Sequence, residues 1–432
     1  MSLPIHRRHF LKSSLVAGST VGLLKNSSPA GEFVSANDTI ILAVLGLNNR
    51  GLNHASDISQ LPGVEIAYVC DVDERVIPRC IEVVAKNQKR KPKGVADFRK
   101  ILDDKTVDAV TIAMPNHWHS AATILSCAAG KHVYVEKPCS QTAEEGEMMV
   151  LEAQKHDRVV HMGNQRRSCP FYIEAVSKLH AGVIGNVLLA RTWYNNRRES
   201  IGIGKVTTPP KELDFLLWQG PAPERPYMDN LVHYNWHWNW HWGNGELGNN
   251  GVHFIDVARW GLGVDYPTQV SSTGGRIRYD DDQQTPDTQL VTYSFGKRMI
   301  TWEGLSWSPY GPSGSRFGIT FHGDQGTMLL DSSGYTIFDL QNNQVGKFHG
   351  KCHDSDHYSN FLSCIRSGDR PTADIEEGHK SSLLCHLGNI SHRVGRPIET
   401  NSQNGHIIGD TEAQALWTRE YRQGWELDDI ML

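Results

Sequence analysis

Several features that would assign the chain to a specialised class are missing from its 432 residues. No Cys-x-x-Cys pair occurs among the eight cysteines, which argues against a zinc knuckle or a redox dithiol and favours buried thiols. No long basic run occurs and the formal net charge is -5, so neither a nucleic acid nor an anionic membrane is an expected partner. There is no internal repeat, and 39% hydrophobic with 21% charged residues is typical of a globular protein of two or three domains.

Residues 1–36 have the layout of a twin-arginine signal peptide. Arg7-Arg8-His9-Phe10-Leu11-Lys12 precedes an apolar stretch from Ser13 to Leu24, which is too short and too polar to span a bilayer. A small-residue cleavage site ends at Val34-Ser35-Ala36. We therefore expect a periplasmic or otherwise exported protein without a membrane span. Because this pathway carries folded proteins, a cofactor can be loaded before export.

From Thr39 onward, short apolar runs alternate with helical patterns, which is typical of a βαβ series. Strands are expected at Thr39–Leu45 and Val64–Cys70, with a helix through Ile58 between them. The turn after the first strand reads Gly46-Leu47-Asn48-Asn49-Arg50-Gly51. A glycine-rich turn between a strand and a helix N-terminus predicts a dinucleotide site, because free helix N–H groups bind a pyrophosphate.

The details of this turn favour NAD. Gly46, Asn48, Arg50 and Gly51 are the expected pyrophosphate contacts, and Asp71 closes the second strand twenty residues after Gly51. Asn48 replaces the usual second glycine; asparagine tolerates the left-handed region and its amide can donate to a phosphate. A carboxylate at position 71 would bind ribose hydroxyls and repel a 2′-phosphate, so NADP is less favoured, although arginines nearby soften that preference.

Two further strands end in polar residues. Asn116 and His117 follow a strand expected at Ala109–Ala113, and Glu136 and Lys137 follow one at His132–Val135. Ligands of open parallel sheets bind outside the carboxyl ends of the strands, so these side chains are expected at the nicotinamide. A lysine among apolar neighbours has a lowered pKa, which makes Lys137 a candidate acid and base.

In combination these motifs make the chain similar to the Gfo/Idh/MocA family of oxidoreductases, which includes glucose-fructose oxidoreductase and inositol dehydrogenase. The stretches that carry the resemblance are the glycine-rich turn, Pro115-Asn116-His117, Glu136-Lys137-Pro138, Gly163-Asn164-Gln165-Arg166-Arg167, Gly251-Val252-His253-Phe254-Ile255-Asp256, Phe361–Gly368 and Asp374–His379. The resemblance implies an α/β fold. A Rossmann doubly wound parallel sheet would span residues 37–164, and an α/β domain with a large, mostly antiparallel open sheet would span 165–432.

The resemblance also implies roles for single residues. Lys137 would transfer the proton of the reacting hydroxyl, with His253 as its partner and Glu136 orienting them. The usual aspartate four residues before this histidine is Asn249 here, which cannot stabilise an imidazolium as a carboxylate does. His253 is therefore expected to align the oxygen while Lys137 carries the proton. Arg166 and Arg167 would contact the substrate.

The segment His233–Trp242 holds four tryptophans at a spacing of two. This alternation predicts an extended strand with one aromatic face, in which Trp236 and His237 would form a lid or wall of a sugar site. An aromatic plug between subunits or domains fits equally well. His237 and His241 suit zinc only on a helix, so no metal is expected. The extension Asn401–Leu432 should pack back on the body through its aromatic residues.

By these interpretations the protein is an exported NAD-dependent oxidoreductase that acts on a hydroxyl of a sugar, cyclitol or sugar derivative. An exported enzyme meets no free NAD pool, so the cofactor should stay bound and be recycled within one cycle. That constraint favours an alternative, an NAD-dependent glycoside-cleaving enzyme that uses transient oxidation and elimination without net redox change. Asn48 and Asn249 motivate a third reading, a sugar-binding protein with a vestigial nucleotide site. A homodimer or homotetramer is implied by analogy alone.

Overall fold

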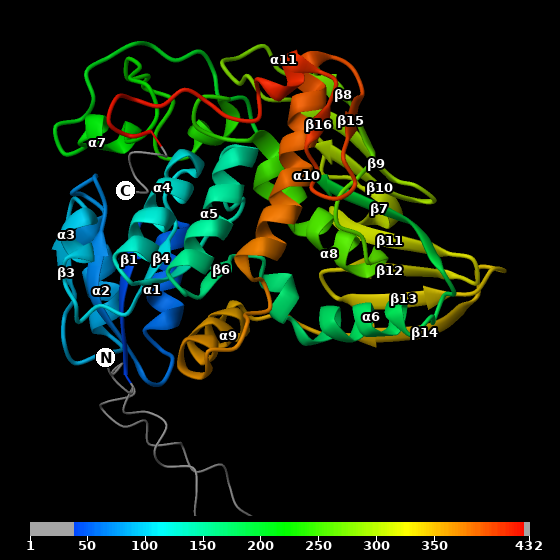
Figure 1. Ribbon diagram of the computed structural model, residues 1–432, viewed down its shortest axis with the longest axis horizontal. Helices are drawn as coiled ribbons and strands as arrows, with labels where there is room; N and C mark the ends of the chain where they lie inside the picture. Colours follow the sequence, from blue (N-terminus) through cyan, green and yellow to red (C-terminus); the bar gives the residue numbers. More distant parts are fainter. Residues whose placement is uncertain (1–38, 427–432) are drawn as a thin grey trace, which may run out of the picture.

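The computed structural model describes residues 39–426, so the expected signal peptide lies outside the described residues. The chain forms a parallel six-stranded sheet followed by a ten-stranded, mostly antiparallel sheet, as expected (Figure 1). Helices pack on both sheets, which makes the fold α/β. Within residues 39–426, no helix combines the length and the apolar character that crossing a membrane requires.

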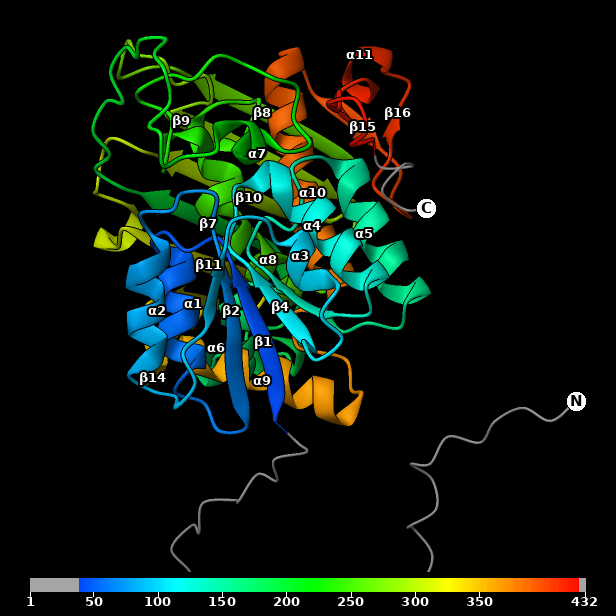
Figure 2. The ribbon, with the colours of Figure 1, turned by 90° about the vertical axis from the view of Figure 1, so that its left-hand side faces the viewer.

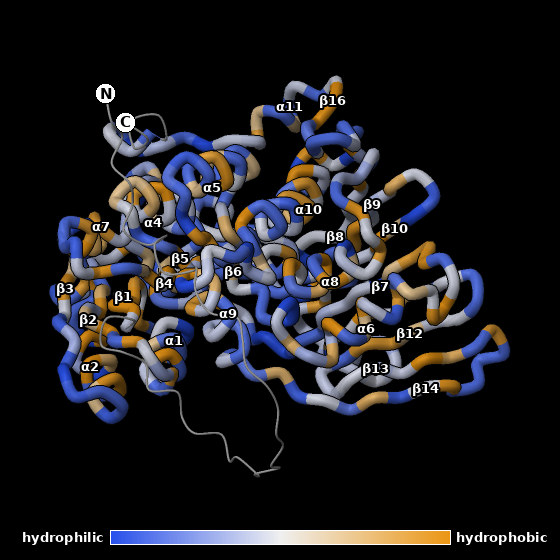
Figure 3. Tube along the Cα trace, turned by 60° about the horizontal axis from the view of Figure 1, so that its bottom comes forward, coloured by the Kyte–Doolittle hydropathy of each residue, from blue (hydrophilic) through white to orange (hydrophobic). Residues whose placement is uncertain are grey.

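The first sheet is a Rossmann fold with the strand order β3-β2-β1-β4-β5-β6. Its helices α1 and α2 lie on one face and α4 and α5 on the other, as Figure 2 shows. β1 is apolar along its whole length, as expected for a parallel strand buried on both faces (Figure 3). The elements are β1 (Ile40–Leu45), α1 (Arg50–Ile58), β2 (Val64–Cys70), α2 (Ile77–Ala85), β3 (Lys93–Val95), α3 (Arg99–Leu102), β4 (Ala109–Ile112), α4 (Asn116–Ala128), β5 (His132–Val135), α5 (Ala143–Lys155) and β6 (Val160–Met162).

The second sheet has the order β14-β13-β12-β11-β7-β10-β9-β8-β15-β16, in which only β7 and β10 pair in parallel. Its strands are β7 (Val187–Asn195), β8 (Gln269–Gly275), β9 (Thr288–Phe295), β10 (Arg298–Leu305), β11 (Phe317–Gly323), β12 (Thr327–Asp331), β13 (Gly334–Phe338), β14 (Gln344–His349), β15 (Ile398–Thr400) and β16 (Ile407–Ile408). The helices of this half are η2 (Gln165–Ser168), α6 (Pro170–His180), α7 (Phe215–Gln219), η3 (Asn235–Trp238), η4 (Leu247–Gly251), α8 (Val252–Leu262), η5 (Pro312–Gly314), α9 (Asp354–Ser367), α10 (Ile375–Val394) and α11 (Thr411–Gln414).

Two helices of the second half join the two sheets (Figure 1). α10 packs against α5 of the first half and against α8 and β8 of the second. α9 lies beside α1, and its Tyr358, Phe361 and Leu362 are buried in one cluster with Leu42 and Val44 of β1. The core of the Rossmann sheet is therefore completed by residues from the second half of the chain.

The C-terminal extension packs back on the body, as expected. Trp425 meets Trp118 of α4 edge to face with ring centroids 5.0 Å apart, and Trp417 and Tyr421 pack against the main core. Arg419 forms a 2.6 Å ion pair with the buried Glu145 of α5. This extension therefore covers the outer side of α4 and α5.

The expectation that all eight cysteines are free thiols is wrong for one pair. Cys169 and Cys352 form a disulfide, although 183 positions separate them in the sequence. The other six cysteines are free and buried. The disulfide holds the segment before α9 against the start of α6, a proximity that only the tertiary fold creates.

Candidate active site

The loops that follow β1, β2, β4 and β5 line a first cavity, which is open to solvent. It lies at the carboxyl ends of the parallel strands, where ligands of such sheets bind. The predicted residues that line it are Gly46, Asn48, Arg50, Asp71, Asn116, Glu136, Lys137, Trp236, His237 and Asn249.

The glycine-rich turn leaves one end of this cavity open for an anion. Gly46 has a φ of 80°, and a Cβ there would lie 2.7 Å from the carbonyl oxygen of Ala113. Gly51 does not line the cavity; it allows α1 to pack, because a Cβ would lie 1.7 Å from the oxygen of Gly46. Asn49 begins α1 without a side-chain cap, and Nη2 of Arg50 is buried without a hydrogen-bond partner among the described residues. Uncapped N–H groups beside an unsatisfied guanidinium fit a pyrophosphate.

The carboxylate predicted to bind ribose lines this cavity beside the glycine-rich turn. Oδ2 of Asp71 accepts a 2.7 Å hydrogen bond from the N–H of Leu47, which ties the end of β2 to the glycine-rich turn. Burial raises the pKa of Asp71. Arg75, which could have bound a 2′-phosphate, instead forms a 2.5 Å ion pair with Asp73. The carboxylate of Asp71 therefore lines the cavity here, and Arg75 of the loop after β2 is not free to bind a 2′-phosphate.

Lys137 stands at the end of β5 and faces Asn249 of the second half. Its Nζ donates to the backbone oxygen of Asn249 at 2.8 Å and to Oδ1 at 3.2 Å. Asn249 lies in η4, a π-helical turn directly before α8, and such turns are frequent at functional sites. Burial lowers the pKa of Lys137. The lysine is thus held by neutral oxygens, with its ammonium form disfavoured.

Glu136 is the buried anion beside this lysine. Its Oε1 lies 2.6 Å from Nε of Arg50 and 3.0 Å from Nε2 of His54. Although burial raises the pKa of Glu136, Arg50 and His54 hold it well below its usual range. The carboxylate therefore stays ionised and fixes Arg50 beside the helix N-terminus.

A second cavity lies next to the first, with about 1150 Å³ of empty space. Arg50, Glu136 and Lys137 line both cavities, whereas His253 of α8 and Arg166 of η2 line only the second. Burial, with the nearby charges of Arg166 and Lys137, keeps the pKa of His253 well below its ordinary value. His253 is therefore a neutral group with an unpaired buried Nδ1 among the described residues, and its predicted role in aligning the substrate oxygen stays a prediction.

A cover segment, residues 196–245, docks over the first cavity. Nε2 of His233 lies 2.8 Å from Oδ2 of Asp73, and the N–H of Asp214 donates to the oxygen of Val72 at 3.0 Å. Trp236 and His237 stack with ring centroids 3.6 Å apart at the cavity wall. The loop after β2 thus anchors the cover segment on the Rossmann domain.

The extended strand predicted for the tryptophan-rich part of this segment is wrong. Residues 235–238 form the 3-10 helix η3, and hydrogen bonds from Asn239 N to Trp236 O and from Trp242 N to Asn239 O continue the turns. Trp236 and Trp242 are buried in a cluster with Phe215 and Trp218. Packing each indole into this cluster, with asparagines at turn positions, outweighs the alternation in the sequence.

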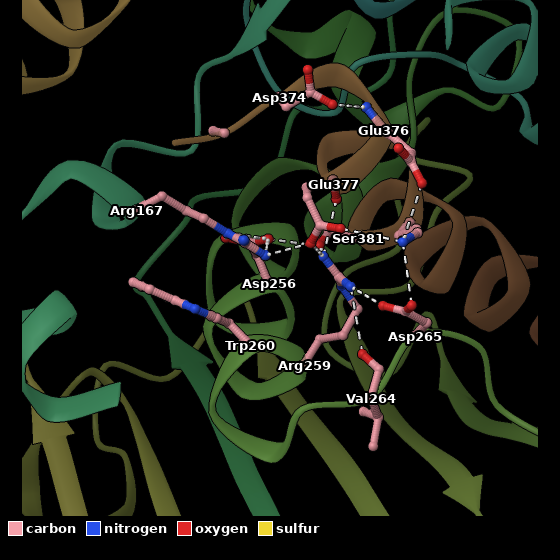
Figure 4. A network of polar contacts seen from close by, with 12 residues as sticks. Arg167, Asp256, Arg259, Trp260, Val264, Asp265, Asp374, Glu376, Glu377 and Ser381 are labelled. Atoms are coloured by element: carbon pink, nitrogen blue, oxygen red, sulfur yellow. Dashed lines mark hydrogen bonds and ion pairs between the residues drawn. The ribbon is translucent and has the colours of Figure 1, made fainter. Parts of the chain in front are cut away.

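Besides Gly51, two predicted contacts, His117 and Arg167, line neither cavity. His117 is fully buried, donates a 2.9 Å hydrogen bond from Nε2 to the carbonyl oxygen of Trp218, and packs on Trp242. Arg167 is buried in an ion-pair network between η2, α8 and α10 (Figure 4). Its Nη2 lies 2.8 Å from Oδ1 of Asp256, which also accepts a 2.6 Å hydrogen bond from Ser381. Both residues support the site structurally, because each has its polar partners inside the protein.

Several residues at the cavities escaped the sequence analysis. His119 lines the first cavity, with its ring nitrogens 2.7 Å from the carbonyl oxygens of Pro138 and Met114. It follows Asn116 by one helical turn, and that spacing could have indicated it. Trp218 and Asp354 come from distant segments, and no local pattern indicates them.

Sequence profiles of one family match most of the chain. Residues 40–164 match its NAD-binding Rossmann fold and residues 192–427 its C-terminal alpha/beta domain. Among solved structures, aldose-aldose oxidoreductase from Caulobacter crescentus has a TM-score of 0.65 at 18% identity, over 84% of this chain and 99% of that one. The WlbA dehydrogenase from Bordetella pertussis, in complex with NADH and UDP-GlcNAcA, has a TM-score of 0.64 at 19% identity over 84% and 99%.

A curated relative, the alpha-N-acetylgalactosaminidase of Shewanella oneidensis, is 26% identical over 210 residues, which cover 44% of this chain and 46% of that protein. The chain thus spans about half the length of the curated relatives it matches. The profiles cover both halves, including the turn, the Lys137 strand end and the His253 helix. The chain therefore belongs to the Gfo/Idh/MocA family of oxidoreductases, with an NAD-binding Rossmann domain.

Proposed function

We propose that the protein is an exported NAD-dependent oxidoreductase that acts on a hydroxyl of a sugar, cyclitol or sugar derivative. The observation that carries this proposal is Lys137. It stands at the strand end nearest the expected nicotinamide, lines both cavities, and has its ammonium form disfavoured by burial. A base in this place can take the hydroxyl proton of a substrate held in the second cavity.

The first cavity fits NAD from end to end. Asn48 and Arg50 with the N-terminus of α1 would hold the pyrophosphate, Asp71 the ribose, and Asn116 the nicotinamide. Asp71 favours NAD over NADP, and the pairing of Arg75 with Asp73 adds to that preference. The cover segment forms one wall of this cavity through Trp218, Trp236 and His237, which supports a cofactor that stays bound during turnover.

When bound, the nicotinamide supplies the acceptor for the hydride that leaves the substrate carbon. Lys137 removes the hydroxyl proton at its Nζ, and Asn249 holds that nitrogen in place. His253 hydrogen-bonds the reacting oxygen from the second cavity. The 2.6 Å ion pair between Glu136 and Arg50 holds both side chains in fixed positions beside Lys137. Positioning the reacting groups in this way contributes much of the rate.

Denaturation of the purified protein tests this proposal. We expect about one equivalent of NAD or NADH in the supernatant, because the contacts of the Rossmann loops and of the cover segment should retain it through purification. Chromatography and mass spectrometry identify the nucleotide. Recovery of NADP would contradict the assigned preference, and a nucleotide-free protein that still binds sugars would favour a sugar-binding function.

A second candidate function is an NAD-dependent glycosidase. Similarity to the Shewanella oneidensis alpha-N-acetylgalactosaminidase favours it. Oxidation and return of the hydride within one cycle needs no cofactor exchange, which suits an exported enzyme without a free NAD pool. Product analysis separates the two candidates. Accumulating NADH with a keto-sugar indicates a dehydrogenase, whereas a reducing sugar and free aglycone without net NADH indicate the glycosidase.

Export and assembly are further parts of the proposal. The Cys169–Cys352 disulfide supports export, because disulfides persist in oxidising compartments. Replacing Arg7 and Arg8 with lysine should retain the protein in the cytoplasm, as cell fractionation would show.

For a homodimer or homotetramer, the support is the exposure of Leu188, Leu290 and Met299 on the ten-stranded sheet. A monomeric mass by light scattering would contradict it.

A further inference from the structure

The second cavity carries an uneven distribution of charge. Its lining contains the cations Arg50, Lys137, Arg166 and Lys351, but only the acids Glu136 and Asp354. Both acids are already bound to Arg50, at 2.6 Å each. Lys137 bonds to neutral oxygens, and the two histidines of the lining do not supply a negative charge. Since Lys137 acts as a neutral base, the lining has an excess of one positive charge, and Arg166 and Lys351 are its cations without an acidic partner in the lining.

Arg166 is the centre of this excess. Its guanidinium lies 4.4 Å from the ring centroid of Phe254 and 6.0 Å from that of Tyr172. Among residues 39–426, no side chain or carbonyl gives the Arg166 guanidinium a hydrogen bond or an ion pair. The neighbouring Arg167, in contrast, is fully paired with Asp256. A half-buried arginine that is held by ring packing and lacks an anion leaves its planar fork of donors free for a ligand.

The backbone that carries Lys351 is covalently tied to the segment that follows Arg166. The Cys169–Cys352 disulfide links the start of α6 to the segment before α9. Cys352 and its neighbour Lys351 both line the cavity, and the Lys351 side chain has no ion-pair partner among the described residues. Both unpaired cations therefore belong to backbone segments that this bond joins. Tying the two backbone segments together reduces the entropy that bringing both cations to one anion costs.

We propose that the substrate is an anionic sugar, whose carboxylate or sulfate is bound by Arg166 and Lys351 while its reacting hydroxyl meets Lys137. This inference rests on the proposed function and specifies its substrate class. Carboxylate and sulfate share the oxyanion geometry that the forked guanidinium recognises. Because Arg166 and Lys137 line the same cavity, the oxyanion and the reacting carbon belong to one sugar unit or to adjacent units.

Matched sugars test the proposal on the intact, nucleotide-loaded protein. The panel contains methyl glucoside, methyl glucuronide and methyl glucoside 6-sulfate, with the corresponding galactose series. Binding is followed by calorimetry and turnover by change in nucleotide absorbance and by product chromatography. We expect an anionic member to have a kcat/KM about ten- to a hundredfold above that of its neutral parent. Whichever of the uronide and the 6-sulfate has the higher kcat/KM shows whether the cavity is built for a carboxylate or for a sulfate.

Single substitutions test whether the preference for an anionic sugar depends on Arg166 of the second cavity. Arg166→Gln should raise KM for the anionic sugar about tenfold or more and reduce its advantage over the neutral parent. Arg166→Lys should restore part of that advantage. Lys347→Gln removes the same charge from an exposed position on β14 outside the cavity and should leave the preference intact. A protein that binds or turns over the neutral parent better, or binds no anionic member, overturns the proposal. Loss of nucleotide from the wild-type protein would instead contradict the oxidoreductase proposal.

Discussion

Lys137→Ala is expected to lower kcat by about 10²–10⁴-fold, the usual contribution of a positioned acid or base. The variant loses the amine that donates to Asn249 and that is proposed to take the substrate proton. The residues expected to hold the pyrophosphate in the first cavity are unchanged. The nucleotide released on denaturation should therefore stay at the wild-type level. Steady-state turnover and nucleotide recovery are measured on the same preparation, and Lys86→Ala, at an exposed position after α2, is the matched control.

The pH profile gives an independent readout of this lysine. Burial lowers the pKa of Lys137, so kcat/KM for oxidation should rise with pH and level off above that lowered pKa, where the base form predominates. His253 should add no rise between about pH 5 and 8, because its pKa lies well below its ordinary value. Undiminished turnover by Lys137→Ala, or a rise that survives in it, would remove Lys137 from its assigned role.

Asp256→Ala should destabilise the protein by about 3–5 kcal/mol, because it leaves the charge of Arg167 buried without its main partner. Asp256 accepts three contacts from Arg167 and one from Ser381, and both ionic partners are nearly inaccessible to water (Figure 4). Guanidinium unfolding followed by tryptophan fluorescence measures the loss. Asp280→Ala, which removes an acid from an exposed loop, should have little effect.

A double variant separates the ion pair from a contact with substrate. Arg167→Met combined with Asp256→Leu replaces both charges by apolar groups and should recover much of the stability that Asp256→Ala loses. If Arg167 instead binds sugar, as the sequence suggested, single variants at 167 would raise KM without changing the unfolding midpoint. That result would contradict the structural role of the network.

Much of the fold is predictable from local pattern. The strands expected at Val64–Cys70 and His132–Val135 have the bounds of β2 and β5. Apolar runs that end in glycine or polar residues define a βαβ series well, because burial on both faces demands them. The same logic places Lys137 and Asp71 at strand ends, and both line the first cavity.

What local pattern cannot determine is which distant residue meets which. Arg166 and Arg167 are equivalent in sequence, but only Arg167 finds carboxylates, on α8 and α10. Asp354 reaches Arg50 across 304 positions, and the Cys169–Cys352 bond spans 183. The tryptophan alternation misleads for a related reason, since burial against Trp218 of α7 decides where each indole goes. Tertiary packing overrides a period-2 pattern in such cases.

The placement of α9 has a consequence for synthesis on the ribosome. Leu42 and Val44 of β1 are translated more than 300 residues before Tyr358, Phe361 and Leu362, which share their cluster. The nascent N-terminal half must therefore keep one apolar surface uncovered until α9 emerges, and it would be a substrate for holding chaperones during that interval. Chains arrested before residue 354 should be protease-sensitive in the first half, whereas chains released after α9 should resist digestion.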